Sequence, residues 1–329
     1  MKALVTGGGG FLGKAVVRLL LARGDQVRSF SRNTYPILAE IGVEQHSGEI
    51  GDTAAVHRAV EGCDIVFHVA AKAGVWGPFE EFYRANVLGT RNVIEACRRH
   101  GIRRLVHTSS PSVVFDGTDM EGVDESVPYP EHFEAFYPQT KAEAEQLVLQ
   151  ANDDTLATVA LRPHLIWGPE DNHLVPRILE QGARGALRRI GTRECLVDTI
   201  YIDNAATAHL QAADLLEIGS VVAGKVYFLS QGEPLPVWEV VNRILDAGGL
   251  PPVTRTISPG LAYAAGAVLE KIYALLHLKS EPRMTRFVAR ELSTVHWFDL
   301  GAARRDFGYE PQVSFDEGID RLRVWLEKC

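Results

Sequence analysis

Short apolar segments recur along the first two thirds of the chain. Several of them are apolar without alternation, as expected for β-strands that are buried on both faces. The predicted strands cover residues 3–5, 26–30, 65–69, 105–108, 157–161 and 225–229. Helical patterns lie between the early strands and cover residues 12–23, 53–60, 86–99 and 140–151. Strands that alternate with helices predict parallel βαβ units, with helices on both faces of one sheet.

The alternation ends near Leu161. Proline and glycine are frequent in residues 163–176, and helical patterns dominate from Pro251 onward. We therefore predict an α/β fold, in which a doubly wound parallel sheet is followed by a smaller, mostly helical C-terminal domain. The first domain is predicted to cover residues 1–170, with residues 198–230 returning to it. Residues 171–197 and 231–329 are predicted to form the substrate-binding part.

Residues 259–278 form a 20-residue, mostly apolar stretch that is about long enough to cross a bilayer. Glu270 and Lys271 lie near its middle, and each costs about 2.5–3.5 kcal/mol at a membrane centre. A core or cavity-lining helix is therefore favoured over a membrane-spanning one. The alternative is an interfacial helix in peripheral membrane contact, with these side chains facing lipid: Tyr263, Leu269, Ile272, Tyr273 and Leu276.

The composition is that of an ordinary globular protein. The 329 residues suggest about two folding units, and 46% apolar with 23% charged residues exclude wholesale disorder, a collagen-like fibre and a disulfide-stapled miniprotein. A formal net charge of −8 argues against nucleic acid as a partner. The cysteines Cys63, Cys97, Cys195 and Cys329 have neither zinc-site nor disulfide spacing, so we expect reduced thiols, no metal and a cytoplasmic protein.

A glycine-rich turn follows the first strand. Residues 6–13 read TGGGGFLG and stand directly before the first helix. Glycine permits a sharp turn, a close approach by phosphate and tight packing of helix on strand, while the N-terminal N–H groups of the helix can bind a pyrophosphate. This context predicts a Rossmann dinucleotide site whose contacts are Gly7, Gly10, Phe11, Leu12 and Gly13.

The tip of the second strand bears on which dinucleotide is bound. An acidic residue there would bind the ribose 2′-hydroxyl of NAD, but Ser31 stands at that position and Arg32 follows it. A guanidinium can bind a 2′-phosphate, so we predict NADPH (NADP when oxidised), the alternative being that Arg32 is a solvated surface charge. Further cofactor contacts are predicted at Glu49 and Ile50, near the adenine, and at Ala70 and Ala71, although each pair could equally be plain core.

Tyr137 and Lys141 lie one turn apart at the start of a predicted helix. A phenol keeps its proton at neutral pH and can act as an acid, and a nearby ammonium is expected to lower the phenol pKa. Serines follow the strand at 105–108, where the carboxyl end of a parallel strand faces ligands. A hydroxyl at that position can donate to a substrate carbonyl oxygen. The serines are Ser109, Ser110 and Ser112.

The TGGGGFLG, TSSPS and YPQTK segments together resemble the extended short-chain dehydrogenase/reductases. The likeness covers nearly the whole chain: residues 161–169 resemble the nicotinamide-side loop of that family, and residues 198–204 with Ala208 and His209 resemble its 3β-hydroxysteroid dehydrogenase branch. Within that branch the chain is most similar to the bacterial OleD-type reductases of long-chain olefin biosynthesis. The resemblance implies reduction of 2-alkyl-3-oxoalkanoic acids with NADPH.

The resemblance also implies residue roles. Tyr137 exchanges a proton with the carbonyl oxygen, Lys141 holds the nicotinamide ribose and tunes Tyr137, and Ser110 matches the catalytic serine. Backbone around Pro163 and Leu165 meets the carboxamide. Pro111 departs from the expected pattern and leaves open which serine faces the substrate. Asn86 matches a helix asparagine of the family that we interpret as structural.

Other functions remain open at this point. The same machinery could serve a 3β-hydroxysteroid or sterol dehydrogenase. A nucleotide-sugar epimerase or dehydratase would need basic residues for a diphosphate, which could come from Arg184, Arg188, Arg189 and Arg193. A non-catalytic NADPH-binding sensor would not need the tyrosine, lysine and serine together. By analogy with relatives, we expect a homodimer through the helices at 86–99 and 140–151, and possible contacts with other olefin-biosynthesis enzymes.

Overall fold

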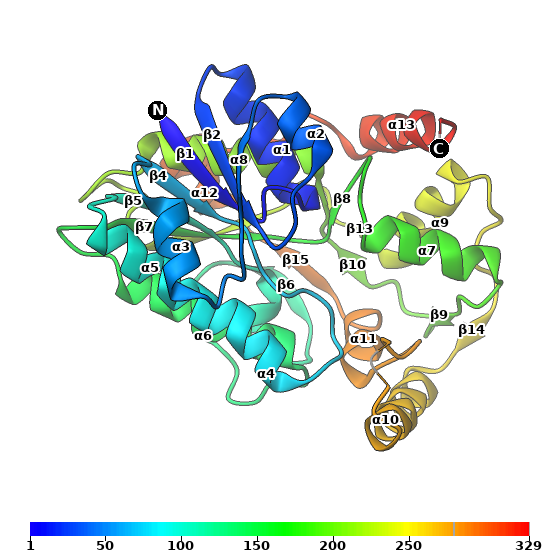
Figure 1. Cartoon of the computed structure of the whole chain (residues 1–329). Coiled ribbons are helices and arrows are strands. Elements are labelled where there is room, and N and C mark those ends of the chain that lie inside the picture. Colours follow the sequence, from blue (N-terminus) through cyan, green and yellow to red (C-terminus); the bar gives the residue numbers. More distant parts are fainter. Residues whose placement is uncertain (279, 329) are drawn as a thin grey trace.

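The computed structural model describes residues 1–278 and 280–328. Within this range the strands of the large sheet run in the order β12–β7–β5–β4–β1–β2–β3, and every neighbouring pair is parallel (Figure 1). The strands are β1 (Lys2–Thr6), β2 (Gln26–Ser31), β3 (Glu44–Ser47), β4 (Ile65–His68), β5 (Arg104–Thr108), β7 (Ala157–Pro163) and β12 (Lys225–Leu229). The prediction of a parallel sheet is confirmed.

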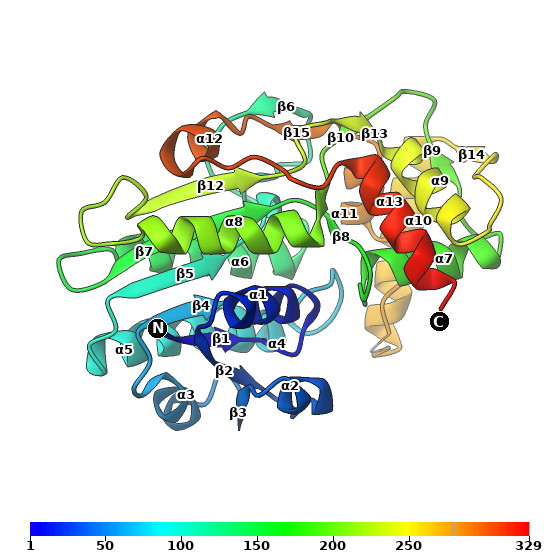
Figure 2. The same cartoon turned by 90° about the horizontal axis from the view of Figure 1, so that it is seen from above.

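Helices cover both faces of the sheet (Figure 2). The helices α1 (Phe11–Ala22) and α8 (Ile202–Leu215) pack on one face, and α3 (Thr53–Val60), α5 (Gly89–Arg99) and α6 (Phe136–Gln150) pack on the other. The short helices α2 (Pro36–Glu40) and α4 (Phe79–Phe82) lie in connections. The doubly wound α/β class is therefore confirmed.

The buried sheet explains why the strands read as continuous apolar runs. Along β1, Ala3 and Val5 belong to the core on the α1 side, whereas Leu4 belongs to the core on the α3 side. Alternate side chains of a strand point to opposite faces, so both sets must be apolar when helices cover both faces.

The helix predicted at 86–99 begins with a different geometry. Residues Tyr83–Leu88 form a π-helical turn that leads into α5. The Asn86 side chain accepts from the Lys72 amide (2.7 Å) and donates to the Thr140 hydroxyl (3.0 Å). Asn86 thus links the loop after β4 to α6. It lies within the π-helical turn, which is wider than an ordinary α-helical turn. This agrees with the structural interpretation of Asn86.

The remaining segments form a smaller part with several short strands. Its helices are α7 (Leu174–Ala183), α9 (Val237–Ala247), α10 (Pro259–Leu275), α11 (Arg286–Glu291) and α13 (Phe315–Leu326). Its strands are β6 (Met120–Val123), β8 (Ile166–Trp167), β9 (Arg189–Ile190), β10 (Leu196–Val197), β11 (Ile200–Tyr201), β13 (Leu235–Pro236), β14 (Thr256–Ile257) and β15 (His296–Phe298). The mostly helical expectation is confirmed, but it missed these strands.

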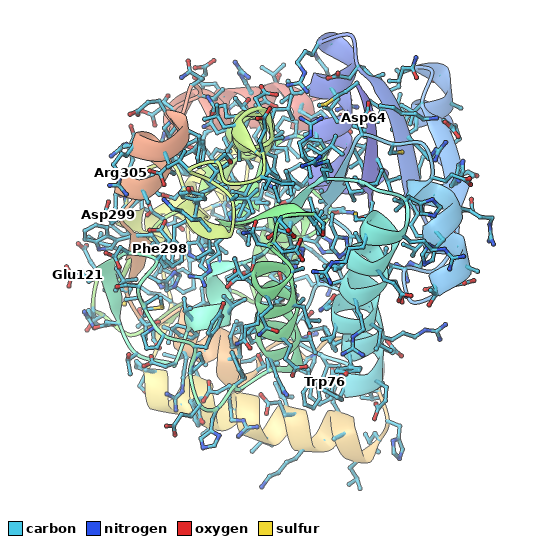
Figure 3. All side chains as sticks on the ribbon, turned by 90° about the vertical axis from the view of Figure 1, so that its left-hand side faces the viewer. Asp64, Trp76, Glu121, Phe298, Asp299 and Arg305 are labelled. Atoms are coloured by element: carbon cyan, nitrogen blue, oxygen red, sulfur yellow. The ribbon has the colours of Figure 1, made fainter. Side chains whose placement is uncertain are left out.

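A second sheet joins segments that are far apart in the sequence. Its order is β13–β10–β15–β6, and β15 pairs with β6 across more than 170 residues. Glu121 of β6 and Phe298 of β15 lie on the same side of the molecule (Figure 3). After residue 231 the chain also returns to the large sheet, because α12 (Gly301–Phe307) packs against β12 and α8.

Helix α10 covers most of the apolar stretch at 259–278. Among the described residues, no helix is both long and apolar enough to span a membrane. Ser258 caps the first turn by accepting from the Leu261 amide, and Pro259 follows at the first helical position. Ala262 and Gly266 are buried, whereas many of the large apolar side chains of α10 face solvent.

A buried ion pair joins α6 to β7. The Arg162 guanidinium donates through Nε and Nη2 to the Glu145 carboxylate at 2.9 and 2.6 Å, and the two side chains are only 2% and 0% exposed. The Tyr129 hydroxyl donates to the same carboxylate at 2.7 Å. Removing one partner would leave the other charge buried without compensation.

We therefore expect Arg162→Met or Glu145→Gln to lower the free energy of unfolding by about 3–5 kcal/mol. Replacing both residues with apolar ones should cost less than either single change, because no buried charge is left. The control is Arg184→Met, which breaks an exposed ion pair with Glu180 and should cost less than about 0.5 kcal/mol. Urea unfolding followed by circular dichroism measures the free energy of unfolding of all four variants. Equal losses from breaking the buried pair and from breaking the exposed pair would contradict this expectation.

Candidate active site

The glycine-rich turn places the first turn of α1 at the edge of a cavity. Gly7 has φ +72° and donates to the Phe30 carbonyl at 2.8 Å, and a side chain there would press on the backbone of Ala70. A Cβ on Gly13 would lie 2.1 Å from the Gly7 carbonyl oxygen. Gly10 caps α1 without a side-chain hydrogen bond. The first amides of α1 are therefore available to an anion such as a pyrophosphate.

The tip of β2 carries polar groups that the described residues leave unpaired. The Ser31 hydroxyl is buried without a hydrogen-bond partner in the described range. Arg32 follows it and is exposed at the rim of the cavity. Tyr35 packs its ring against Gly9 and adds an aromatic wall that the sequence did not suggest. This region can hold the polar groups of an adenosine ribose.

All the predicted contacts line one cavity of about 960 Å³ at the carboxyl ends of the strands. The cofactor candidates among them are Gly7, Gly10, Phe11, Leu12, Gly13, Ser31, Arg32, Glu49, Ile50, Ala70, Ala71, Pro163 and Leu165. The catalytic candidates are Tyr137, Lys141 and Ser110. Cys63, Cys97 and Cys195 are buried elsewhere, and Cys329 lies outside the described residues. The structure thus brings together segments that are up to 160 residues apart.

Lys141 is buried at the bottom of the cavity. Its ammonium donates to the Thr108 carbonyl at 2.6 Å and lies 3.4 Å from His107 Nε2. Burial lowers the pKa of Lys141 to about 8, and the charge of Glu145 partly opposes this shift. The position on α6, one turn after Tyr137, follows from the helical spacing.

Tyr137 lies in the first turn of α6, where its phenol is close enough to the Ser110 hydroxyl for that group to affect its pKa. The pKa of Tyr137 is raised, because burial disfavours the phenolate and the charge of Glu291 adds to this effect, while the Ser110 hydroxyl opposes it. The expectation that Lys141 lowers this pKa is therefore wrong for the protein alone. The Lys141 ammonium is directed at the Thr108 carbonyl, and desolvation dominates.

The three serines after β5 have different environments. Ser110 caps a 3₁₀ turn, Pro111–Val114, and its Oγ lies 2.9 Å from Ser112 Oγ. Ser109 is buried, and its hydroxyl has no partner among the described residues. Pro111 thus bends the strand exit into a tight turn, and among the three serines it is the Ser110 hydroxyl that lowers the pKa of Tyr137.

The loop after β7 closes another wall of the cavity. Leu165 has φ +45°, a strained conformation for a residue with a branched side chain. The His164 ring is buried, and its Nε2 lies 2.8 Å from His296 Nδ1 of β15. Burial holds the pKa of His164 well below its usual range, and the nearby His296 lowers it further. Both rings are therefore neutral links between β7 and the smaller part.

Sequence reasoning missed several residues that line this cavity. Phe287 and Glu291 reach it from α11, about 150 residues after Tyr137. Asp171 and His173 lie at the start of α7, where the Asp171 carboxylate accepts from the amides of His173 and Val175. No local motif marks these residues. Only Asp171, placed just before a helix, carried a recognisable capping signal.

Known proteins resemble this chain over nearly its whole length. The profile of the 3-beta hydroxysteroid dehydrogenase/isomerase family matches residues 4–258. A 2-alkyl-3-oxoalkanoate reductase of Stenotrophomonas maltophilia is 55% identical, covering 98% of this chain and 99% of the relative. A protein of the same name from Shewanella oneidensis is 50% identical, and the match covers 98% of this chain and 86% of the relative. The mouse decarboxylating sterol-4-alpha-carboxylate 3-dehydrogenase is 33% identical, covering 97% and 89%.

Solved structures share the fold. The crystal structure of gox2253 has a TM-score of 0.79 and 26% identity, covering 99% of this chain and 98% of the other. MoeE5 in complex with UDP-glucose and NAD has a TM-score of 0.77 and 25% identity, covering 100% and 99%. The glycine-rich turn, the cavity and these similarities together indicate a nicotinamide dinucleotide site in this chain.

Proposed function

Since this chain belongs to the 3-beta hydroxysteroid dehydrogenase/isomerase family, we propose that it reduces a 2-alkyl-3-oxoalkanoic acid to the corresponding 2-alkyl-3-hydroxyalkanoic acid with NADPH. The chain is an oxidoreductase that acts on a keto group. The observation that carries the proposal is the convergence of Tyr137, Ser110 and Lys141 in the cavity that also contains the glycine-rich turn.

Each side chain has one chemical task in this mechanism. When bound, the reduced nicotinamide supplies the hydride. Tyr137 gives its proton to the carbonyl oxygen, and Ser110 donates a hydrogen bond to the same oxygen as negative charge develops on it. Lys141 would hold the nicotinamide ribose hydroxyls, because its ammonium is buried at the floor of the cavity. The raised pKa of Tyr137 keeps the phenol protonated and ready to donate.

The substrate assignment rests on the relatives and on an apolar cavity wall. The relatives at 55% and 50% identity carry the name of this activity. Among the lining side chains, Val75, Leu165, Ile166 and Phe287 offer apolar surface to alkyl branches. A sterol dehydrogenase is the second candidate and is favoured only by the relatives near 33% identity. A panel of branched and ring-shaped ketones separates these two functions.

Two further alternatives find little support. The arginines proposed for a sugar diphosphate do not line the cavity: Arg184 pairs with Glu180, Arg193 with Asp119, and Arg188 and Arg189 bind backbone carbonyls. A cofactor-binding sensor without catalysis would not need a phenol, a hydroxyl and a buried ammonium at one place. The reductase therefore remains the better explanation.

The preference for NADPH is supported by the tip of β2. Ser31 and Arg32 line the cavity there, and the Ser31 hydroxyl has no partner among the described residues. A phosphate at the ribose 2′ position would satisfy both groups, whereas a plain hydroxyl would leave the guanidinium unused. We propose that Arg32 contributes most of the discrimination.

Helix α10 supports the proposed contact with lipid. Its solvent-facing side is an apolar stripe interrupted by Lys271, and it consists of Leu261, Val268, Ile272, Leu275 and Leu276. Tyr263 does not belong to this stripe, because its hydroxyl bonds Glu134, and Tyr273 packs its ring against Trp76. Trp76 lies beside α10 (Figure 3) and donates to the Leu278 carbonyl, and the preceding residue, Val75, lines the cavity.

Other partners stay predictions. The outer faces of α5 and α6, proposed for a homodimer, carry polar residues such as Arg91, Glu95 and Glu143. Pairing across them would therefore be through polar contacts. Interaction with other olefin-biosynthesis enzymes and a cytoplasmic location likewise remain predictions.

Replacing Tyr137 with Phe removes the proton donor and leaves the ring. We expect turnover to fall by roughly 10²–10⁴-fold, the usual contribution of a positioned general acid. The dissociation constant for NADPH, measured by fluorescence titration, should change less than about twofold. Tyr83→Phe is the control, since that phenol lies outside the cavity. Turnover near that of the unmodified enzyme in Tyr137→Phe would exclude the proposed role.

Replacing Arg32 with Ala should affect the two cofactors unequally. The KM for NADPH is expected to rise roughly 10–100-fold, since hydrogen bonds to a charged group contribute about 1.5–3 kcal/mol. The KM for NADH should change less than about twofold. Arg91→Ala removes an exposed arginine away from the cavity and serves as the control. An equal effect on both cofactors would refute the assignment of Arg32.

Flotation with phosphatidylcholine vesicles tests the lipid contact. We expect the protein to float. Val268→Glu combined with Leu275→Glu should abolish flotation, because two charges would enter the exposed apolar stripe that is proposed to contact lipid. Val324→Glu changes an exposed apolar residue on α13 and should leave flotation intact. Failure of the unmodified protein to float, or flotation of the double variant, would remove the proposal.

A further inference from the structure

The Glu291 carboxyl lies on the cavity wall without an assigned role. It ends α11 and lines the same cavity as Tyr137 and Ser110. Within residues 1–278 and 280–328, no hydrogen bond or ion pair involves its carboxyl oxygens. It is half-buried and its neighbour on the same wall is the apolar side chain of Phe287. A carboxyl placed in this way has hydrogen-bonding capacity left for a ligand.

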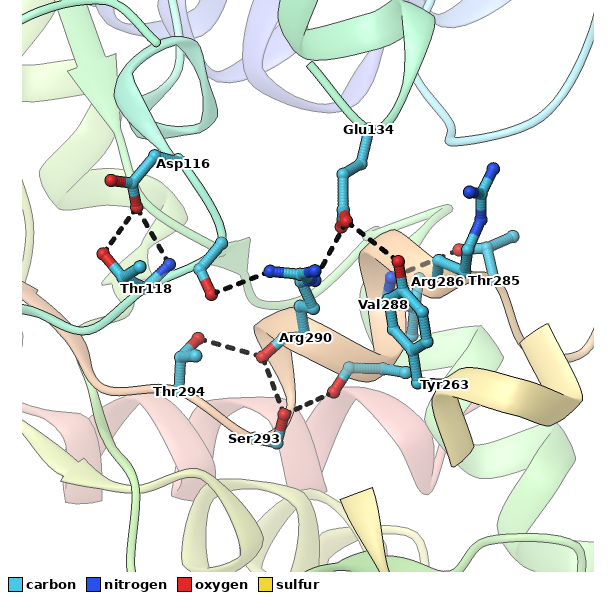
Figure 4. A network of polar contacts seen from close by, with 12 residues as sticks. Asp116, Thr118, Glu134, Tyr263, Thr285, Arg286, Val288, Arg290, Ser293 and Thr294 are labelled. Atoms are coloured by element: carbon cyan, nitrogen blue, oxygen red, sulfur yellow. Dashed lines mark hydrogen bonds and ion pairs between the residues drawn. The ribbon is translucent and has the colours of Figure 1, made fainter. Parts of the chain in front are cut away.

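The helix that carries Glu291 is fixed to the chain just before Tyr137. Arg290 Nε lies 2.9 Å from the Glu134 carboxylate, and the Tyr263 hydroxyl donates to the same carboxylate at 3.4 Å (Figure 4). Thr285 caps the helix by accepting from the Val288 amide. Glu134 precedes Tyr137 by three residues, so this network ties α11 to the start of α6.

The C-terminal end of α11 is fixed to the large sheet as well. His296 Nε2 donates to the Glu291 carbonyl at 2.8 Å, and His164 Nε2 donates to His296 Nδ1 at 2.8 Å. Burial lowers the pKa of both imidazoles, so they act as neutral links. The backbone of Glu291 is thus held from two sides, and its side chain alone is free to face the cavity.

The charge environment of Glu291 is uneven. Its desolvation raises the pKa of the carboxyl to about 7, and the more distant charge of Arg177 opposes this shift. Arg177 is itself paired with Glu281 at 2.5 Å. Titratable groups that share the cavity with Glu291 include Tyr137, Lys141, His164, Asp171 and His173. The groups that contact α11 are Glu134, Tyr263, Glu270 and His296, and α11 itself carries Arg286 and Arg290. The proton on Glu291 is therefore present on a large share of molecules at neutral pH.

The proposed substrate needs a group to bind its carboxylate close to Tyr137. In a 3-oxo acid one carbon separates the ketone from the carboxylate, so the carboxylate must bind beside the group that contacts the ketone oxygen. The cations that line the cavity have other places or tasks. Lys141 donates to Thr108 and would hold the nicotinamide ribose, and Lys72 pairs with Glu81. Arg32 lies at the tip of β2, and the Arg84 side chain packs against Gly51 on the loop after β3. Glu291 is close enough for its charge to raise the pKa of Tyr137.

We propose that the Glu291 carboxyl, in its protonated form, binds the carboxylate of the substrate through one O–H···O⁻ hydrogen bond. The inference rests on the proposed function, since it assumes an acidic substrate. Hydrogen bonds of this type are short and roughly twice as strong as neutral ones. Two carboxyl groups that share one proton strongly favour keeping that proton, as in carboxylate pairs of other active sites. Binding the substrate should therefore take up a proton.

Isothermal titration calorimetry with NADPH present tests this directly. The probes are a 2-alkyl-3-hydroxyalkanoic acid and its methyl ester, which lacks the charge, each titrated in two buffers of different ionisation enthalpy. The pKa of Glu291 is about 7 in the free enzyme. Binding of the acid should therefore be accompanied by uptake of close to one proton at pH 8 and almost none at pH 6. The dissociation constant of the acid should rise about tenfold from pH 6 to pH 8, and that of the ester should stay constant.

Two variants assign the proton. Glu291→Gln keeps a donor, so it should bind the acid at both pH values without proton uptake, and Glu291→Leu should weaken acid binding at pH 6 at least tenfold while the ester is unaffected. Glu180→Gln, on the exposed side of α7, is the control. Uptake that persists in Glu291→Gln would belong to another group and would overturn the inference.

A wrong role for Glu291 and a wrong substrate assignment would give different results. If the acid and the ester both bind but the unmodified enzyme takes up no proton with the acid, the role of Glu291 falls and the proposed function stands. If neither probe binds and the 2-alkyl-3-oxo acid is not reduced, the substrate assignment falls and the role of Glu291 falls with it.

Discussion

The site depends on one buried hydrogen bond between helix α6 and strand β5. The Lys141 ammonium donates to the Thr108 carbonyl at 2.6 Å, and the Arg162–Glu145 ion pair fixes the same helix to β7. An ammonium in a buried position must be paired, because its desolvation is costly. This requirement fixes the rotation of α6 over the sheet. Since Tyr137 lies one turn earlier, the phenol is carried to the carboxyl ends of the strands, beside Ser110.

The same burial affects the protonation of the catalytic groups. Desolvation lowers the pKa of Lys141 and raises that of Tyr137, so the phenol keeps its proton at neutral pH in the protein alone. A protonated phenol beside a hydroxyl donor suits the reduction of a ketone, which ends with a proton on oxygen. The carboxyl of Glu291, also protonated on a large share of molecules, adds a further donor to this cavity. The site therefore combines several neutral proton donors with an apolar wall.

Much of this was visible in the sequence because its signals are local. The glycine turn at residues 6–13, the Tyr137–Lys141 spacing and the serines after β5 each occupy a few consecutive residues. Glu291, the His164–His296 link and the β15–β6 pairing join segments more than 100 residues apart, and no pattern announces them. The pKa of Tyr137 was predicted in the wrong direction, because the sequence shows a lysine nearby but not how deeply the phenol is buried.

The most direct test of the central claim is a crystal structure with NADPH and a 2-alkyl-3-hydroxyalkanoic acid bound together. The account predicts the Tyr137 and Ser110 hydroxyls within hydrogen-bonding distance of the substrate 3-oxygen, and the nicotinamide C4 facing the carbon that bears it. A Tyr137 ring turned away from the nicotinamide, with no serine hydroxyl beside the substrate oxygen, would contradict it.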